Sequence, residues 1–171
     1  MQQLRAYPDI ESAPGELGRL SGPCGPISVW LVLTHHGISA SPREIVSACR
    51  YTDEFGSFAV CLAEALQCFG LRVRFHSEPD TEQKPLETES YASITALPPV
   101  SVSRLLRHVA LGCSVILSYA AVGGEGHFSP LAGARANKLL LPYDIAGQML
   151  KSEFAKRWRA RGICRQAIVA A

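Results

Sequence analysis

The sequence has no run of apolar residues long enough to cross a bilayer or to form the core of a signal peptide. We therefore expect a cytoplasmic protein with no membrane partner, unless a dedicated secretion machine exports it. A large excess of charge is also missing, because the formal net charge is +2. The basic residues near the C-terminal end are interpreted as a solvated helix face, so nucleic acid is not an expected partner.

Patterns for metal or disulfide sites are missing too. The chain has 6 cysteines, but no CxxC pair and no Cys/His cluster with zinc spacing accompanies them. Most of them lie among apolar neighbours, as buried thiols do in a reducing compartment. We therefore expect no metal, no cofactor and no disulfide framework.

What is present indicates one globular domain over residues 1–171. The composition is 47% hydrophobic and 19% charged, which is ordinary for a soluble domain of this length. Apolar spacing predicts a helix that begins at Cys24, a second that begins at Ser41-Pro42, and a third over about 59–69. The run LRVRFH alternates as a strand does, and the Ser-, Thr-, Glu- and Pro-rich stretch 77–100 is interpreted as a surface excursion.

The second half of the chain is richer in strand patterns. A helix is predicted over 102–111, followed by three strand-like runs, SVILSYA, HFSPLAGA and KLLLPYD, which we expect to be neighbours in one antiparallel sheet. An exposed helix over 152–161 and the apolar strand ICRQAIVA complete the chain. Helices first and sheet second predict an α+β fold, with an N-terminal helical half followed by an antiparallel β-sheet half.

The clearest chemical signal is the segment SGPCGP, which places Cys24 where a helix begins. The positive end of a helix dipole favours a thiolate over a thiol, so Cys24 is a candidate nucleophile. Glycines beside it, Gly25 above all, would let a substrate backbone approach closely. A Gly/Pro-rich turn around a buried structural cysteine is the competing interpretation of this motif alone.

Two further residues complete a catalytic pattern. His127, in GGEGHFSP, stands at the start of a strand as a candidate base, and Gly126 before it is a candidate substrate-binding position. Asp144 ends KLLLPYD, the strand predicted to lie beside the histidine strand. Its carboxylate would hold the imidazole in its useful tautomer, so we predict a Cys24–His127–Asp144 triad.

These segments resemble a known family. CGPISVWLVLTHHG, LGCSVIL, GHFSPLAG and D-x-x-G followed by EFAKRW occur in the order seen in the bacteriocin-processing, double-glycine leader peptidases of the papain clan. GHFSP is also similar to phytochelatin synthases, papain-like enzymes that transfer a γ-glutamylcysteine unit. The resemblance implies a papain-like fold over nearly the whole chain, a bacterial protein, and Cys24, His127 and Asp144 as the triad.

One position departs from both families. They usually carry a glutamine shortly before the cysteine, whose amide helps to bind the oxyanion, whereas the corresponding position here is Gly18. Loss of one oxyanion donor typically costs about 10²–10³ in turnover. The Cys24 backbone N–H would remain as a donor, and Arg19 or Ser21 could supply a substitute.

Three functions remain open from the sequence. The first is a cysteine peptidase or acyl-transfer enzyme that forms a thioester acyl-enzyme on a peptide, acyl-peptide or carrier-linked substrate. The second is a phytochelatin-synthase-like γ-glutamylcysteine transferase or an amide-forming biosynthetic acyltransferase. The third, from another class, is a catalytically weak papain-like binding module, which the missing glutamine supports.

Overall fold

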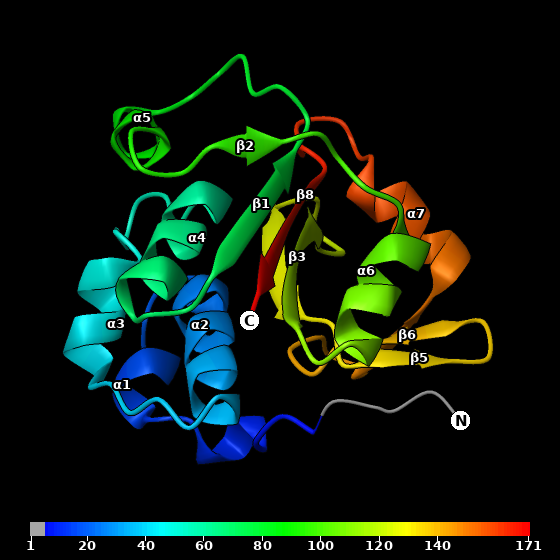
Figure 1. Ribbon diagram of the computed structural model, residues 1–171, viewed down its shortest axis with the longest axis horizontal. Coiled ribbons are helices and arrows are strands. Elements are labelled where there is room, and N and C mark those ends of the chain that lie inside the picture. The colour runs from blue at the N-terminus through cyan, green and yellow to red at the C-terminus, as the bar shows by residue number, and fades with distance from the viewer. Residues whose placement is uncertain (1–5) are drawn as a thin grey trace.

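The computed structural model describes residues 6–171, and its helices and strands form two regions (Figure 1). The first region holds a short 3-10 helix, Ile10–Ser12, and four α-helices: α1 (Gly15–Gly18), α2 (Cys24–His35), α3 (Pro42–Ala48) and α4 (Ala59–Cys68). The second is built on strands and is covered by α6 (Val102–Ala110) and α7 (Lys151–Trp158). This confirms the predicted α+β fold. Within the described residues, no helix has both the length and the apolar character that crossing a membrane requires.

Capping residues explain where the first helices begin and end. The Ser41 hydroxyl accepts a hydrogen bond from the Glu44 N–H at 3.3 Å, and the Glu44 carboxylate accepts one from the Ser41 N–H at 2.7 Å. This capping box starts α3. Gly37, with φ of 70°, adopts the left-handed conformation that lets the chain leave α2.

The main sheet has five strands in the order β2-β1-β8-β3-β4. They are β1 (Val73–Ser77), β2 (Ala96–Leu97), β3 (Ser114–Ala120), β4 (Gly126–Pro130) and β8 (Gln166–Ala170). β1 and β2 run parallel, and the other neighbours are antiparallel. The C-terminal strand β8 therefore lies in the middle of the sheet, while β4, which carries His127, lies at its edge.

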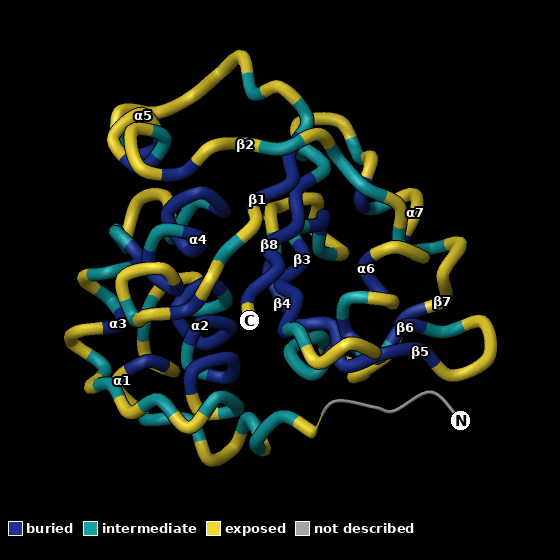
Figure 2. The backbone as a smooth tube through the Cα atoms, viewed as in Figure 1, coloured by how far each residue is buried: buried dark blue, intermediate teal, exposed yellow. Residues whose placement is uncertain are grey.

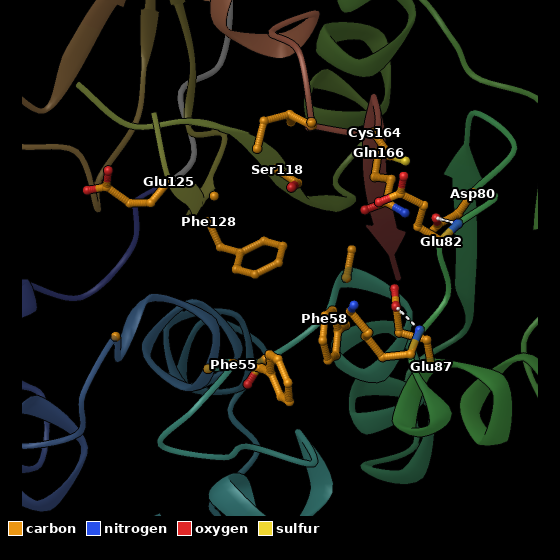
Figure 3. A pocket seen from close by; sticks show the side chains of 18 of the residues that line it. Phe55, Phe58, Asp80, Glu82, Glu87, Ser118, Glu125, Phe128, Cys164 and Gln166 are labelled. Carbon is orange, nitrogen blue, oxygen red and sulfur yellow. Dashed lines mark hydrogen bonds between the residues drawn. The ribbon is translucent and has the colours of Figure 1, made fainter. Parts of the chain in front are cut away.

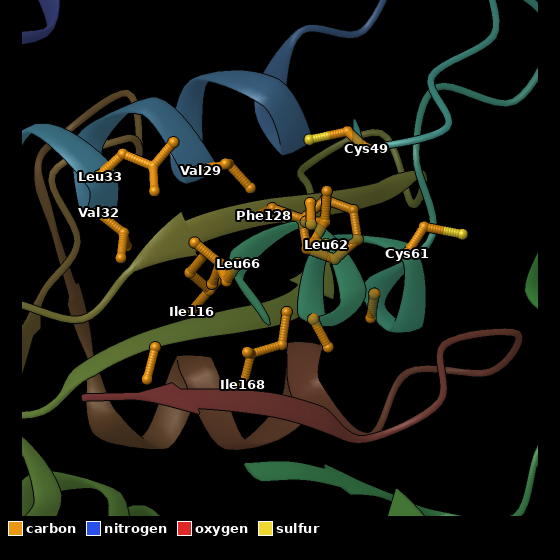
Figure 4. Close-up of a cluster of buried hydrophobic side chains, with 14 of the residues drawn as sticks. Val29, Val32, Leu33, Cys49, Cys61, Leu62, Leu66, Ile116, Phe128 and Ile168 are labelled. Carbon is orange, nitrogen blue, oxygen red and sulfur yellow. The ribbon is translucent and has the colours of Figure 1, made fainter. Parts of the chain in front are cut away.

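Side chains of this sheet alternate between two hydrophobic cores, one on each face. On β3, Ile116 packs with α2 and α4 (Figure 4), whereas Leu117 and Tyr119 pack on the side of α6 and α7. The buried segments in Figure 2 follow the central strands and α2. Apart from Trp30, every residue of α2 from Gly25 to Leu33 is buried. An apolar helix of this kind needs cover on all sides, which fixes the position of Cys24 at its first turn.

The prediction that three consecutive strands form one antiparallel sheet is wrong. β4 ends at Pro130, and the next two residues bond to different partners. The Leu131 N–H donates to the Val115 carbonyl at 2.8 Å, and the Ala132 N–H donates to the Leu140 carbonyl at 2.9 Å. The chain therefore crosses into a separate sheet of three strands: β5 (Gly133–Arg135), β6 (Lys138–Leu140) and β7 (Gln148–Leu150).

The stretch 77–100 is more ordered than the sequence predicts. It contains α5 (Pro85–Tyr91) and strand β2, which extends the main sheet beside β1. α5 is fixed to α4, because the Ser90 hydroxyl donates to the Glu64 carboxylate at 2.6 Å. This segment is therefore part of the fold, and it forms one wall of the cleft described below.

Candidate active site

Cys24 is the first residue of α2, and its thiol lies between that helix and strand β4. Burial raises the pKa of the Cys24 thiol, while hydrogen bonds from the backbone N–H groups of Phe128, Gly25 and Cys24 itself act to lower it. Phe128 directly follows His127 on the edge strand. The fold thus brings the candidate nucleophile to the strand that carries the candidate base.

His127 is held by a backbone carbonyl and two aromatic rings. Its Nε2 lies 2.6 Å from the Tyr143 carbonyl oxygen, and its ring stacks on the Tyr143 ring with centroids 5.5 Å apart and planes at 17°. The Tyr119 ring meets it edge-on at 5.4 Å. Because a carbonyl oxygen only accepts hydrogen bonds, Nε2 carries the proton, which leaves the Nδ1 lone pair to act as a base.

Asp144 lies near this assembly but makes a different contact from the one predicted. Its Oδ2 accepts a hydrogen bond from the buried Tyr119 hydroxyl at 2.9 Å. Within residues 6–171 no hydrogen bond joins Asp144 to His127. The sequence places Asp144 on a strand beside β4, whereas it lies in the loop between β6 and β7 of the second sheet. The loop presents the preceding carbonyl, that of Tyr143, to the imidazole.

Tyr119 and Tyr143 are therefore site residues that sequence reasoning missed. The Tyr143 N–H donates to the buried Ser129 hydroxyl at 3.0 Å, which fixes the peptide whose carbonyl meets His127. Burial and the nearby Cys24 charge raise the pKa of Tyr143, so its ring also lies close to the thiol. No sequence motif indicates these roles. Tyr143 contributes its backbone carbonyl, which any residue has, and Tyr119 contacts His127 because the two residues are paired across β3 and β4.

Cys24 opens onto a cleft with a volume of about 740 Å³ (Figure 3). Ser21 and Gly126, two of the predicted substrate-binding residues, line it. Arg19 does not, since its guanidinium lies back along α1, 3.4 Å from the place a Cβ on Gly15 would take. Gly25 is buried behind the cleft lining, where a Cβ would come within 2.9 Å of the Ser57 Cβ. Close helix packing therefore requires this glycine.

Two positions bear on oxyanion binding. Gly18, the position at which the family resemblance implies a glutamine, is exposed at the end of α1 and does not line the cleft, and nothing lies within 4 Å of the place its Cβ would occupy. Ser57 lines the cleft beside Gly25, and its buried hydroxyl has no hydrogen-bond partner in the described chain. Sequence reasoning did not single out Ser57. This hydroxyl is an unsatisfied buried polar group next to the cleft.

No group of three or more His, Cys, Asp or Glu residues within positions 6–171 is arranged to hold a metal ion. Neither models of known protein families nor curated proteins match the sequence.

Solved structures do match. The peptidase domain of Streptococcus ComA, a bifunctional ABC transporter involved in quorum sensing, superposes with a TM-score of 0.55 at 20% identity, over 86% of this chain and 90% of that one. A double-glycine-motif protease from an AMS/PCAT transporter, in complex with its leader peptide, gives a TM-score of 0.57 at 15% identity, over 99% of this chain and 94% of that one.

This chain has the papain-like α+β fold of those peptidase domains. The papain-like fold covers the helical region and both sheets, because the second match extends over nearly the whole chain. In this papain-like frame Cys24 begins the buried helix and His127 lies on the edge strand that faces it.

Proposed function

We propose that the chain is a papain-like cysteine peptidase or acyl-transfer enzyme that acts on a peptide-like substrate through Cys24. The observation that carries the proposal is the packing of α2, which begins at Cys24, against strand β4, which carries His127. A thiol at a helix N-terminus beside a histidine is the arrangement that activates cysteine nucleophiles. The peptide-bound neighbour supports a peptide substrate.

In the proposed reaction His127 Nδ1 accepts the Cys24 proton, and the sulfur electron pair forms a bond to an amide or thioester carbonyl carbon. The imidazolium then returns the proton to the leaving amine or thiol as the bond to it breaks. Water or an amine next attacks the acyl-enzyme, with His127 taking its proton, and the carbon–sulfur bond breaks to regenerate the thiol. Hydrolysis and transfer differ only in this acceptor.

Asp144 enters the proposal as a positioning residue. Its carboxylate binds the Tyr119 hydroxyl and so anchors the loop whose Tyr143 carbonyl accepts the His127 Nε2 proton. That carbonyl also stabilises the imidazolium formed during attack, because it meets the ring at Nε2. For the oxyanion, the Cys24 N–H and the unpaired Ser57 hydroxyl are the proposed donors, with Ser21 a further polar group on the cleft wall.

A second candidate, a catalytically weak binding module, is favoured by one observation. Burial leaves the pKa of the Cys24 thiol above its ordinary value, whereas an efficient nucleophile of this type needs it lowered. The two candidates differ in how Cys24 reacts at a pH where an ordinary thiol is protonated.

The deciding experiment is brief treatment with limiting iodoacetamide at about pH 6, below the ordinary thiol pKa, followed by peptide mapping. Wild type is compared with His127→Ala and with a matched control, His108→Ala, on helix α6. The enzyme proposal predicts rapid labelling at Cys24 that is lost only in His127→Ala. Slow or scattered labelling of wild type would favour the binding module.

The acceptor and the substrate class need a second assay. Wild type and Cys24→Ser are incubated with a leader peptide ending in Gly-Gly and, separately, with glutathione. Cleavage after Gly-Gly supports the peptidase, and γ-glutamylcysteine transfer supports the transferase. If neither compound reacts although iodoacetamide labels Cys24 rapidly, both substrate assignments are rejected. The proposal that Cys24 is an activated thiol still stands.

A further inference from the structure

The cleft beside Cys24 carries strong negative charge. Of the residues that line it, seven are aspartate or glutamate and one, Lys84, is basic. The acidic groups come from three separate places: the loop before α4, the segment from Glu78 through α5, and the β3–β4 turn that leads to His127. In Figure 3 the carboxylates of Asp80, Glu82 and Glu87 gather on one side of the cleft.

Much of this charge is not neutralised inside the molecule. Glu78 pairs with Arg165 at 3.4 Å. In the described chain, by contrast, no hydrogen bond or ion pair engages the side chains of Glu54, Glu82 or Glu125. All three are exposed residues of the cleft lining, so their charges give this concave surface a negative field that attracts cations.

Glu87 shows that the acidic side extends into the protein interior. It is 4% exposed, yet it lines the cleft with only the Lys84 backbone N–H, at 2.8 Å, as a donor. Burial raises the pKa of its carboxyl, and neighbouring Asp80 raises it further. A buried carboxylate beside a second carboxylate costs free energy unless it takes up a proton or a cation approaches it.

An independent observation on the same cleft is a pair of aromatic rings. Phe55 is 47% exposed, which is unusual for a phenylalanine, and its ring centroid lies 6.0 Å from that of Phe58. Both rings line the cleft (Figure 3). Exposed aromatic surface marks binding sites, and ring faces attract alkylammonium and guanidinium groups.

We infer that this cleft binds a cationic substrate segment, a lysine- or arginine-containing chain or an alkylamine, next to the carbonyl that Cys24 attacks. The inference rests on the proposed function, because it takes the Cys24 cleft to be the substrate site. The carboxylates would hold the charge, and Phe55 and Phe58 would pack on its alkyl stem. An anionic segment would meet repulsion from three sides of the cleft.

The test uses two thiol reagents of opposite charge, 2-aminoethyl methanethiosulfonate and 2-sulfonatoethyl methanethiosulfonate. Each reacts by thiolate attack on its sulfenyl sulfur, which forms a mixed disulfide and releases methanesulfinate, so turnover is not needed. At Cys24 we take the rate of modification by the cationic reagent divided by the rate for the anionic reagent. This ratio is normalised by the same ratio at Cys68, an exposed thiol outside the cleft, which corrects for the different intrinsic reactivity of the two reagents.

We expect this normalised ratio to be about tenfold or more at low ionic strength and to fall as salt screens the field. Glu54→Gln and Glu82→Gln should each lower it, whereas the matched control Glu16→Gln, on exposed α1, should not. A ratio near one, or one that Glu16→Gln lowers equally, overturns the inference.

A library of fluorogenic peptide amides then separates this inference from the proposed function. A preference of about tenfold or more for lysine or arginine over glutamate at one position, reduced in Glu82→Gln, supports both. Turnover without any charge preference overturns the cationic substrate alone. A third outcome is that the methanethiosulfonate reagents show charge selectivity while Cys24 does not react with iodoacetamide at about pH 6. The enzyme proposal would then fail, and the cleft would remain a cation-binding site.

Discussion

Restoring the missing glutamine is the sharpest perturbation that the structure allows. Gly18 lies at the end of α1, outside the left-handed region, with nothing within 4 Å of the place its Cβ would take. Gly18→Gln therefore introduces an amide without a clash or backbone strain. Because removal of an oxyanion donor costs about 10²–10³ in turnover, we expect the added donor to raise kcat by about tenfold or more, with a smaller change in KM.

The assay is steady-state hydrolysis of a fluorogenic peptide amide that the wild type turns over, with thermal denaturation alongside. Gly18→Ala is the matched control, because replacing glycine stabilises a helix by about 0.5–1 kcal/mol without adding a donor. Both variants should gain stability, and only the glutamine variant should gain kcat. Equal kcat values for Gly18→Gln and Gly18→Ala would refute the reasoning and favour Ser57 as a sufficient donor.

Three further predictions follow from packing and charge. Gly25→Ala should lower the free energy of unfolding by about 1–3 kcal/mol in urea titrations, because its Cβ would lie 2.9 Å from the Ser57 Cβ. Tyr119→Phe should cost about 1.5–3 kcal/mol and shift the pH profile of kcat, since it frees the Asp144 carboxylate; Phe154→Leu, in the same core as Tyr119 and outside the cleft, is the packing control. Burial acts to raise the pKa of Glu64, but bonds from Arg50, Ser90 and Ser93 hold it below 4.5, so wild type should lose stability below that pH faster than Glu64→Gln does.

The helices and the place of Cys24 at the start of one of them were predictable because they depend on local patterns. Ser41-Pro42 and Gly37 mark helix ends by capping chemistry, and α3 begins and α2 ends at these positions. The Phe154 and Trp158 pair, four apart, places the inner face of α7, and both side chains are buried. Such signals lie within one element, so they can be recognised without knowing what the element packs against.

Sheet assignment and site geometry were not predictable in the same way. The chain passes from the main sheet to the second sheet at Leu131–Ala132, because the two N–H groups donate to carbonyls of β3 and β6 respectively. These partners are distant in sequence, so local patterns do not predict them. The contact at His127 follows from the same crossing, because it moves Asp144 off the neighbouring strand. The acidity of the 77–100 stretch was visible, but an acidic surface loop and a cleft wall have the same composition, and only the packing of α5 on α4 separates them.

The raised pKa of Cys24 and the acidic cleft together bear on how the proposed nucleophile would be activated. Burial opposes thiolate formation at Cys24 and raises its pKa. The N–H groups of Phe128, Gly25 and Cys24 offset it only in part. If the inferred cationic segment binds beside the thiol, its positive charge would favour the thiolate and lower the pKa of Cys24. The same charge would then both select the substrate and help to activate the proposed nucleophile.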